Sequence, residues 1–498
     1  MSFLCHYLLR TRRSVYLPLY HAVRMQCEDK GPKEPDEPKV STENIPGPQS
    51  KKLKQDLNQM QLSEAVLTFG DYEKSIGNFL ADADGNMMLD CFTQMATLPV
   101  GYNHPRIIKL FKDEKNIRTL INRPALGLFP DKEWPNKLKS VLMSVAPGGL
   151  KNVQTMSCGS CANETAFKSA FFAYTARGRA DDEPFTQEEM TTCMANQPPG
   201  SAKLCILSFK GAFHGCTMGA LSATSYRYIQ KVGVPAFEWP TVPYPSYKYP
   251  LDEFVTENKA IDKRCLDDVE MMITQMKKFR PVAGVIIEPI QSEYGDLHAS
   301  PEFFRSLQKL CKKKKVALIM DEIQTGCGAS GKMWCHQHFD LDEPPDIVTF
   351  SKKMQIGGYY HSNAMRPRQP FRIFSTWMGD PGKLLILEEV LKIINDEDLL
   401  ENVTFVGDFL LAGLMAMERE FPCIMHSVRG RGTLIAFSVI NKKTREEVLK
   451  KLLMKGIMAS GCGKDSIRFR PALTFTQKQA EIVLDRLKKA MCELESKG

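Results

Sequence analysis

Two short apolar runs in the middle of the chain end on residues that could do chemistry. The run 316–320 (VALIM) stops on Asp321, and the run 346–351 (DIVTFS) stops on Lys352. Each run is too short for a helix and is rich in β-branched or large apolar residues, so we predict two buried strands. Because ligands of open α/β sheets bind at the carboxyl ends of such strands, this acid and this lysine are candidate ligand-binding residues.

An acid and a lysine at neighbouring strand ends suggest a cofactor with a basic nitrogen and a carbonyl group, and pyridoxal phosphate has both. A lysine that attacks the cofactor aldehyde needs a deprotonated amine, which is the role expected of Lys352. A carboxylate must keep the pyridine nitrogen protonated so that the ring can act as an electron sink, and Asp321 suits that role. Single charges at strand ends are usually solvated, so it is the pairing of the two that favours this cofactor.

The glycine-rich loop 326–332 (GCGASGK) offers a different chemistry, because it nearly matches a nucleotide-binding loop. Met333, however, stands where that motif needs a hydroxyl residue to hold magnesium. The loop would also follow the same strand that supplies the magnesium-binding acid, whereas nucleotide binding needs the two motifs on separate strands. The sequence therefore argues against a nucleotide hydrolase.

From about residue 106 to 385, strand-like runs alternate with helical ones. Such alternation predicts an α/β fold in which helices cover both faces of a mostly parallel sheet. The amphipathic segment 301–315 begins with Pro301 and should be the crossover helix between two strands. Further strands are predicted at 204–209, 282–290, 433–439 and 466–470, helical sequence at 386–420 and 477–495, and loops at 178–201 and 235–250.

At 498 residues the chain is too long for one core, so we predict more than one domain. Residues 106–385 should form a large cofactor-binding domain, and residues 386–498 a smaller α+β domain. The segment 28–105 begins with charged, proline-rich sequence and turns at Asp84-Gly85 as a hairpin. We expect this segment to contribute to the small domain.

The composition is that of a soluble enzyme, with 43% apolar and 25% charged residues and no apolar stretch of membrane-spanning length. Arginines before Glu28 supply part of the net charge of +8, and the remainder is too small and scattered to indicate nucleic acid binding. Residues 1–27 contain no acid and have the composition of a mitochondrial transit peptide, the alternative being a disordered basic tail. We therefore expect a protein of the mitochondrial matrix whose fifteen cysteines are mostly reduced.

Specific motifs surround the candidate residues along most of the chain. Asp321 opens DEIQTG, and Lys352 lies in an SKK motif that is followed by Gly357-Gly358. The other motifs are CGSCANE (158–164), GAFHG (211–215), EPIQSE (288–293), NRPALG (122–127), RIFSTWMGDP (372–381) and GCGKDSIRFRP (461–471). From about Pro46 to the carboxyl terminus, the chain resembles the class III (subgroup II) pyridoxal-phosphate-dependent aminotransferases, and the last three motifs are typical of the branch that acts on 4-aminobutyrate. The resemblance implies the fold-type I architecture, with a mostly parallel seven-stranded sheet in the large domain.

The resemblance also assigns roles to individual residues. Lys352, and not Lys353, would be the Schiff-base lysine, and Asp321 would pair with the pyridine nitrogen. Backbone N–H groups at a helix amino terminus would bind the phosphate. The other implied cofactor contacts are Gly159 and Ser160 at the phosphate, Phe213 on the ring face, Gln324 near the ring hydroxyl, and Thr376 at the phosphate of the partner subunit, which implies a homodimer.

Cys158 and Cys161 form a Cys-x-x-Cys pair beside the expected phosphate site. A lone pair of this kind would ordinarily be two core thiols. Two such pairs across a dimer axis would supply enough thiolates for a 2Fe–2S cluster. Animal members of the 4-aminobutyrate branch carry a cluster between their subunits, so the resemblance implies one here.

Substrate choice would depend on three further residues. Glu293 and Arg468 match a glutamate–arginine pair of the family. That pair stays together while an ω-amino acid is bound, and it separates so that the arginine can bind the α-carboxylate of glutamate or 2-oxoglutarate. The alternative is an ordinary structural ion pair. The family motif GAFHGRT supplies an arginine for the distal carboxylate of the substrate, but this chain has Cys216 there. Losing that charge-assisted interaction would cost about 1.5–3 kcal/mol of binding free energy.

The expected activity is transamination of 4-aminobutyrate, or of a similar ω-amino acid such as β-alanine, with 2-oxoglutarate. The products would be succinate semialdehyde and glutamate. Because of Cys216, two alternatives stay open, namely an aminotransferase of this class with a different amino donor and a weakly active cofactor-binding relative with a structural or binding role. A nearby cation that compensates for the missing arginine is the third explanation.

Overall fold

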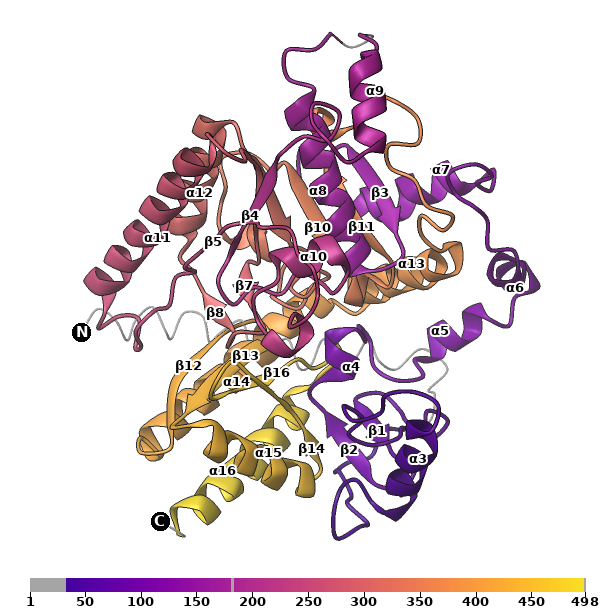
Figure 1. Cartoon of the computed structure of the whole chain (residues 1–498). Helices are drawn as coiled ribbons and strands as arrows, with labels where there is room; N and C mark the ends of the chain where they lie inside the picture. Colours follow the sequence, from indigo (N-terminus) through magenta and orange to yellow (C-terminus); the bar gives the residue numbers. More distant parts are fainter. Residues whose placement is uncertain (1–32, 181–182, 497–498) are drawn as a thin grey trace. The chain divides into compact units, whose positions relative to one another are not determined.

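The computed structural model describes residues 33–180 and 183–496, and its contacts divide the chain into the units Met1–Pro35 and Asp36–Gly498. The predicted transit peptide at 1–27 lies outside the described residues. Every element discussed below belongs to the second unit (Figure 1).

The largest sheet has seven strands. Strand β11 is antiparallel to both of its neighbours, and all other adjacent strands run parallel. The mostly parallel, seven-stranded sheet predicted from the sequence is therefore confirmed. In spatial order the strands are β3 (Asn152–Met156), β11 (Gly357–His361), β10 (Ile347–Phe350), β9 (Ala317–Asp321), β6 (Val282–Ile287), β4 (Cys205–Phe209) and β5 (Thr241–Val242).

Helices cover both faces of this sheet. Successive residues of a strand point to opposite faces, so the apolar cluster that each residue joins shows which helix covers that face. In β9, Ile319 belongs to the apolar cluster that includes Ala166 of α8, whereas the next residue, Met320, belongs to the cluster that includes Phe303 of α12. Figure 1 shows α8 on one face and α11 and α12 together at another part of the sheet. The helices concerned are α8 (Gly159–Thr175), α10 (Met218–Ala223), α11 (Val255–Met276) and α12 (Pro301–Lys314).

Helix α12 confirms the predicted crossover helix at 301–315. Ser300 precedes it, and its Oγ accepts a hydrogen bond from Phe303 N at 3.0 Å. Pro301 lies in the first turn, where its missing N–H has no helical partner to lose. Lys315 ends the helix in the left-handed conformation at φ 56°, and the chain then enters β9 beside β6.

The smaller sheets combine amino- and carboxyl-terminal sequence. Strand β2 (Met87–Asp90) pairs with β1 (Phe79–Ala81) across the predicted Asp84-Gly85 hairpin, and it also pairs in parallel with β14 (Ile457–Met458). The domain boundaries proposed at 105 and 385 stay predictions. A four-stranded sheet contains β12 (Met425–Arg431), β13 (Leu434–Val439), β16 (Ser466–Phe469) and β15 (Ser460–Cys462), and α14 (Leu399–Glu420), α15 (Lys442–Met454) and α16 (Gln477–Glu495) pack beside it.

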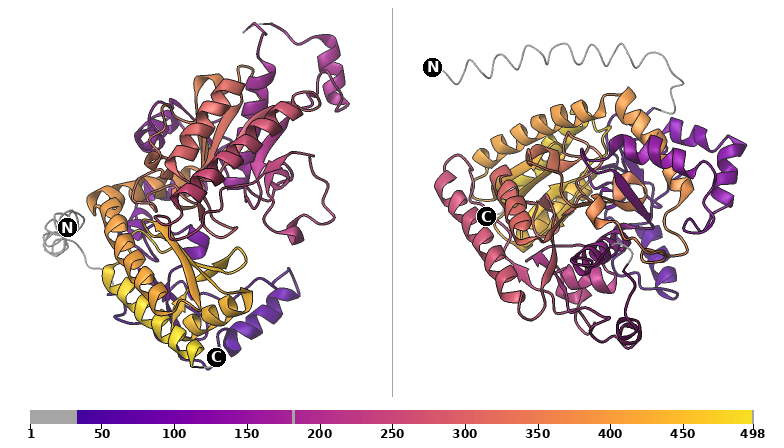
Figure 2. Two further views of the ribbon diagram at one scale, coloured as in Figure 1. Left: turned by 90° about the vertical axis from the view of Figure 1, so that its left-hand side faces the viewer. Right: turned by 90° about the horizontal axis from the view of Figure 1, so that it is seen from above.

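The helical sequence expected at 386–420 is divided between two helices. Helix α13 (Pro381–Asp396) ends before Asp398, which adopts a left-handed conformation at φ 51°, and α14 follows. Among the described residues, α14 alone is long and apolar enough to be compared with a membrane span, with a mean hydropathy of 1.5. Its Leu410 and Leu414 are buried in the core that it shares with α16, and Figure 2 shows the two helices side by side. Packing within the chain therefore accounts for its apolar face.

Two predicted loops contain short regular elements. Within 178–201 lies α9 (Gln187–Met194), which a capping box between Thr186 and Glu189 stabilises. The prolines of 235–250 flank β5, which is an edge strand, and an edge strand tolerates the missing N–H of proline. Polar composition hid α9 and the prolines hid β5, because the stability of these elements depends on a capping box and on a neighbouring strand.

The buried ion pair between Arg470 and Asp296 generates a stability prediction. Both side chains are 1% exposed, so removal of the carboxylate would leave an uncompensated guanidinium inside the protein. We expect Asp296→Ala to lower the free energy of unfolding by about 3–5 kcal/mol, measured by urea denaturation. Asp485→Ala breaks a half-exposed pair with Lys489 and should cost less than about 1 kcal/mol. Equal losses in the two variants would contradict the prediction.

Candidate active site

Asp321 is the last residue of β9 and is fixed by hydrogen bonds from three directions. Its Oδ2 lies 2.8 Å from Asn163 Nδ2 and 2.8 Å from His214 Nδ1, and its Oδ1 accepts from Ile323 N at 3.0 Å. The side chain is only 4% exposed. A carboxylate held in this way is oriented before any ligand arrives, as a group that pairs with a cationic ring nitrogen needs to be.

Lys352 lies close to Asp321 because β9 and β10 are parallel neighbours, with Thr349 of β10 opposite Asp321. Burial lowers the pKa of Lys352 to about 8. The negative charge of Glu293 opposes this shift, and the positive charge of Arg468 adds to it. A lysine of this kind is partly deprotonated near neutral pH, which a nucleophilic amine requires.

The adjacent Lys353 occupies different surroundings. It is 2% exposed, and its Nζ donates to Ala96 O at 3.3 Å. Burial lowers its pKa to about 7, opposed by Cys327 and reinforced by Arg470. Lys353 is therefore a core residue, which supports the choice of Lys352 as the cofactor lysine, although that role stays a prediction.

The amino terminus of α8 offers backbone N–H groups to an anion. Cys158 is the N-cap residue, and its side chain makes no capping hydrogen bond. Gly159 begins the helix at a close approach, since a Cβ there would lie 3.0 Å from Ile323 Cδ1. Ser160 Oγ accepts from Cys216 N at 3.1 Å. The partial positive charge of this terminus suits a phosphate, and phosphate binding by Gly159 and Ser160 stays a prediction.

Phe213 is half-buried in the loop after β4, and its backbone N donates to Glu288 Oε1 at 3.1 Å. Burial raises the pKa of Glu288 well above its usual range, and the negative charge of Asp321 acts in the same direction. Both effects favour the neutral form of Glu288, which limits the negative charge beside Asp321.

Sequence reasoning did not select His214 and Asn163, although both contact Asp321. In the part of the chain that the structure describes, His214 Nε2 and Asn163 Oδ1 are buried without a hydrogen-bond partner. Such atoms are rare in folded proteins and are expected where a ligand or water completes the site. Both residues belong to the quoted motifs GAFHG and CGSCANE, but only the fold shows that they converge on Asp321.

Glu293 and Arg468 form the ion pair that was predicted, with 2.9 Å between Glu293 Oε1 and Arg468 Nη2. Arg468 is 4% exposed. Burial acts to raise the pKa of Glu293, but Arg468 more than offsets it, so that this pKa lies below its usual value. Gln324 Oε1 accepts from Arg468 at 3.4 Å and from Arg470 at 3.2 Å, and Gln324 Nε2 donates to Glu293 at 3.4 Å. The contact of Gln324 with a ring hydroxyl stays a prediction.

The Cys158 and Cys161 sulfur atoms lie 3.4 Å apart. Burial, together with the neighbouring thiol of Cys158, raises the pKa of Cys161 to about 11. No group of three or more His, Cys, Asp and Glu side chains suited to a metal ion occurs among residues 33–180 and 183–496. One chain thus offers two thiols, and a cluster would need a second pair.

Thr376 is exposed in the segment between β11 and α13. A hydrogen bond from Ser157 Oγ to Trp377 O at 2.8 Å ties this segment to the residue before the Cys158 N-cap.

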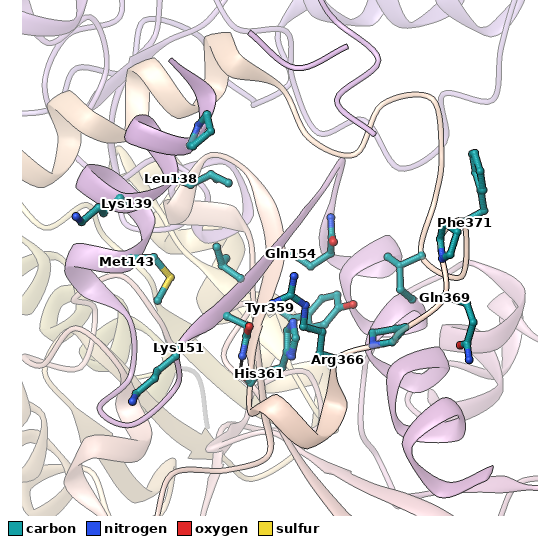
Figure 3. A pocket seen from close by; sticks show the side chains of 16 residues that line it. Leu138, Lys139, Met143, Lys151, Gln154, Tyr359, His361, Arg366, Gln369 and Phe371 are labelled. Atoms are coloured by element: carbon teal, nitrogen blue, oxygen red, sulfur yellow. Dashed lines mark hydrogen bonds between the residues drawn. The ribbon is translucent and has the colours of Figure 1, made fainter. Parts of the chain in front are cut away.

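A cavity of about 510 Å³ lies along the edge strand β3, and Figure 3 shows the side chains that line it. Lys139, Lys151, Gln154, His361, Arg366 and Phe371 are among them, and none of the predicted site residues is. The cavity is therefore separate from the candidate active site.

The residues present fit pyridoxal phosphate. The uncapped start of α8 can accept a phosphate, the buried carboxylate of Asp321 can hold a ring nitrogen, and Lys352 supplies an amine of lowered pKa. The unpartnered atoms of His214 and Asn163 show that the protein alone leaves hydrogen-bonding capacity unused there.

Comparisons with known proteins agree with this chemistry. The family profile described as "Aminotransferase class-III" matches residues 61–491. The chain is 49% identical to mitochondrial 4-aminobutyrate aminotransferase of Mus musculus, over 90% of each chain, and 46% identical to 4-aminobutyrate aminotransferase of Dictyostelium discoideum, over 93% of each. Among solved structures, lysine aminotransferase from M. tuberculosis superposes with a TM-score of 0.79 at 26% identity, covering 89% of this chain and 99% of that one.

The lowered pKa of Lys352 generates a chemical prediction. We expect limiting acetic anhydride to label Lys352 in the cofactor-free protein with a midpoint near pH 8, measured by mass spectrometry of the peptide. The same peptide in unfolded protein should titrate near pH 10.4, about the pKa of a hydrated lysine. Arg468→Met should raise the folded midpoint because it removes a nearby positive charge. Arg118→Met, which breaks an exposed pair with Glu114, is the control and should leave the midpoint unchanged.

An unchanged midpoint in Arg468→Met, in protein that is folded by circular dichroism, would contradict the electrostatic explanation.

Proposed function

The chain belongs to the class-III aminotransferase family, and we propose that it transfers the amino group of 4-aminobutyrate, or of a similar ω-amino acid such as β-alanine, to 2-oxoglutarate. The products would be succinate semialdehyde and glutamate. The names of the relatives in several organisms support this donor. One observation carries the proposal, namely the meeting of Asp321 and a lysine of lowered pKa at the ends of neighbouring parallel strands.

Pyridoxal phosphate, when bound, supplies a ring that withdraws electrons from the substrate carbon bearing the amino group. Asp321 would hold the ring nitrogen, and Phe213 would lie against the ring face. Gly159 and Ser160 would bind the phosphate through the start of α8. Lys352 Nζ would remove the proton from the substrate carbon as a general base and then deliver it, as a general acid, to carbon C4′ of the cofactor.

The ion pair between Glu293 and Arg468 suits an ω-amino acid. Such a donor has no carboxylate on the carbon that carries the amino group, so the arginine can stay paired. Glutamate and 2-oxoglutarate do have one, and Arg468 would have to leave Glu293 to bind it. The hydrogen bond from Arg468 to Gln324 offers a second partner that could hold the guanidinium during this exchange.

Cys216 bears on the choice of amino donor. It is exposed beside Ser160, and a thiol cannot form the bidentate contact that an arginine forms with a carboxylate. A donor without a distal carboxylate would be favoured by this position. A cofactor-binding protein with little activity is the further alternative, and the names of the relatives, all 4-aminobutyrate aminotransferases, argue against it.

We also propose a homodimer in which Thr376 reaches the phosphate of the partner subunit. Exposed Phe371, Phe374 and Trp377 flank Thr376. Exposed apolar side chains grouped in this way mark interaction surfaces, and a second copy of the chain would bury them.

A mitochondrial location is supported by the names of the animal relatives. We propose that residues 1–27 are a transit peptide and that the compartment is the mitochondrial matrix. We also propose a 2Fe–2S cluster held by Cys158 and Cys161 of two subunits, supported by the two neighbouring thiols of each chain.

The donor preference can be measured directly. Purified protein loaded with pyridoxal phosphate should form glutamate from 2-oxoglutarate and 4-aminobutyrate, and Lys352→Ala should abolish turnover. Cys216→Arg should lower the KM for 4-aminobutyrate about ten- to a hundredfold, because it restores a charge-assisted contact. Cys423→Arg adds the same charge at another exposed cysteine and serves as the matched control.

If glutamate forms with other donors but not with 4-aminobutyrate, the proposed donor is wrong. An unchanged KM in Cys216→Arg would show that Cys216 does not limit the use of this donor.

The cluster proposal predicts iron in anaerobically purified protein. About two irons and two acid-labile sulfides per dimer are expected, with visible absorption that disappears in Cys158→Ser and Cys161→Ser. Cys193→Ser, at an exposed cysteine elsewhere, should keep the iron. Iron-free protein with full activity would rule out a cluster.

A further inference from the structure

Residues Thr93–Ala96 form a left-handed helical turn that contains no glycine. Their φ angles are 47°, 53°, 61° and 63°. Backbone hydrogen bonds close the turn, from Ala96 N to Phe92 O at 2.8 Å and from Thr97 N to Thr93 O at 2.9 Å. A left-handed backbone is unfavourable for residues other than glycine, so the surrounding structure must hold the turn in place. Strain of this kind concentrates at functional sites.

The carbonyl groups of the turn face the loop that carries the candidate cofactor lysine. Three successive carbonyl oxygens accept hydrogen bonds from three side chains of that loop. Reversing the sign of φ in the turn would redirect these carbonyl groups, so the conformation and the contacts depend on each other. The bonds run from Lys352 Nζ to Met95 O at 3.0 Å, from Lys353 Nζ to Ala96 O at 3.3 Å, and from Gln355 Nε2 to Thr97 O at 3.0 Å.

Asp90 stabilises the turn through hydrogen bonds to its first backbone N–H groups. Its Oδ1 accepts from Phe92 N and from Thr93 N, both at 2.8 Å. Its Oδ2 accepts from Tyr102 Oη at 2.6 Å, and Tyr102 Oη in turn accepts from Gln94 Nε2 at 2.8 Å. Asp90 is completely buried and Tyr102 is 5% exposed, so the hydrogen bond between them is shielded from water.

A further hydrogen bond joins the turn to the strand that carries Arg468. Thr93 Oγ1 donates to Arg470 O at 2.6 Å, and Arg470 N donates to Cys91 O at 2.6 Å. The turn thus contacts both the lysine loop and the end of β16. It is held by side chains on each side and has little freedom to relax.

We propose that the turn Thr93–Ala96 is a positioning element for Lys352. Met95 O holds the Lys352 amine in the site whenever that amine is not joined to cofactor, and Asp90 is a positioning residue that maintains the turn. The inference rests on the proposed function for the identity of Lys352 as the cofactor lysine. Without this contact, the flexible side chain of lysine would leave the buried site for solvent.

The electrostatic surroundings of Lys352 make such a release measurable. The charged groups that face it are Glu293 and Asp321, which favour its protonation, and Arg468 and Arg470, which oppose it. Burial holds its pKa at about 8, whereas a hydrated lysine has a pKa of about 10.4. A rise of one unit would reduce the deprotonated amine at pH 7 about tenfold.

A pair of substitutions at Met95 tests the proposal. Its side chain is 59% exposed, so a change there alters the backbone preference and little packing. Glycine accepts the left-handed conformation, whereas β-branched isoleucine disfavours it. In the cofactor-free full-length protein, Met95→Ile should label with acetic anhydride at Lys352 about tenfold more slowly at pH 7 than Met95→Gly, with a higher midpoint pH. The rate of pyridoxal phosphate capture should fall in the same order.

Tyr102→Phe provides a second test if Met95→Ile does not fold. It removes the Oη that links Asp90 to Gln94 and keeps the ring, and it should raise the Lys352 midpoint in the same direction. Identical labelling profiles in Met95→Ile, Met95→Gly and Tyr102→Phe would overturn the proposal. These profiles need no substrate, so failure of the proposed donor would appear only as missing glutamate formation in the parent protein.

Discussion

Parallel pairing between β9 and β10 is the interaction on which the candidate site depends. Thr349 lies opposite Asp321, so the chain leaving β10 brings Lys352 to the edge of the sheet where the carboxylate ends β9. Both strands are buried on both faces, and their charged residues therefore occur where the apolar runs stop. A slip of one residue in β9 would turn Asp321 to the opposite face, and a slip in β10 would do the same to the residues that lead to Lys352.

Burial then tunes the charges that this pairing brings together, and the neighbours decide the direction. Lys352 and Glu288 both move towards their neutral forms, since desolvation dominates for each. Glu293 moves the other way, because Arg468 lies 2.9 Å from it. The site therefore combines an amine that is partly deprotonated near neutral pH with a retained ion pair, which is a useful combination for removing a proton while binding a carboxylate.

Much of the fold could be predicted because its signals are local. The β-branched runs, the Pro301 start of α12 and the glycine of the Asp84-Gly85 hairpin each act through a few neighbouring residues. Other features carried no local signal. The turn at Thr93–Ala96 lacks the glycine that usually marks positive φ, and α9 depends on a capping box within polar sequence.

By itself, the sequence determined the class of chemistry, because an acid and a lysine at consecutive strand ends, within specific motifs, allow few other cofactors. It also determined that Cys216 stands where an arginine was expected. Only the tertiary structure decided that His214 and Asn163 both contact Asp321, and that Lys352 and Lys353 bind successive carbonyl oxygens of one strained turn. These contacts join residues that are far apart in the chain, and they arise from the packing of strands and loops whose relative positions no local pattern encodes.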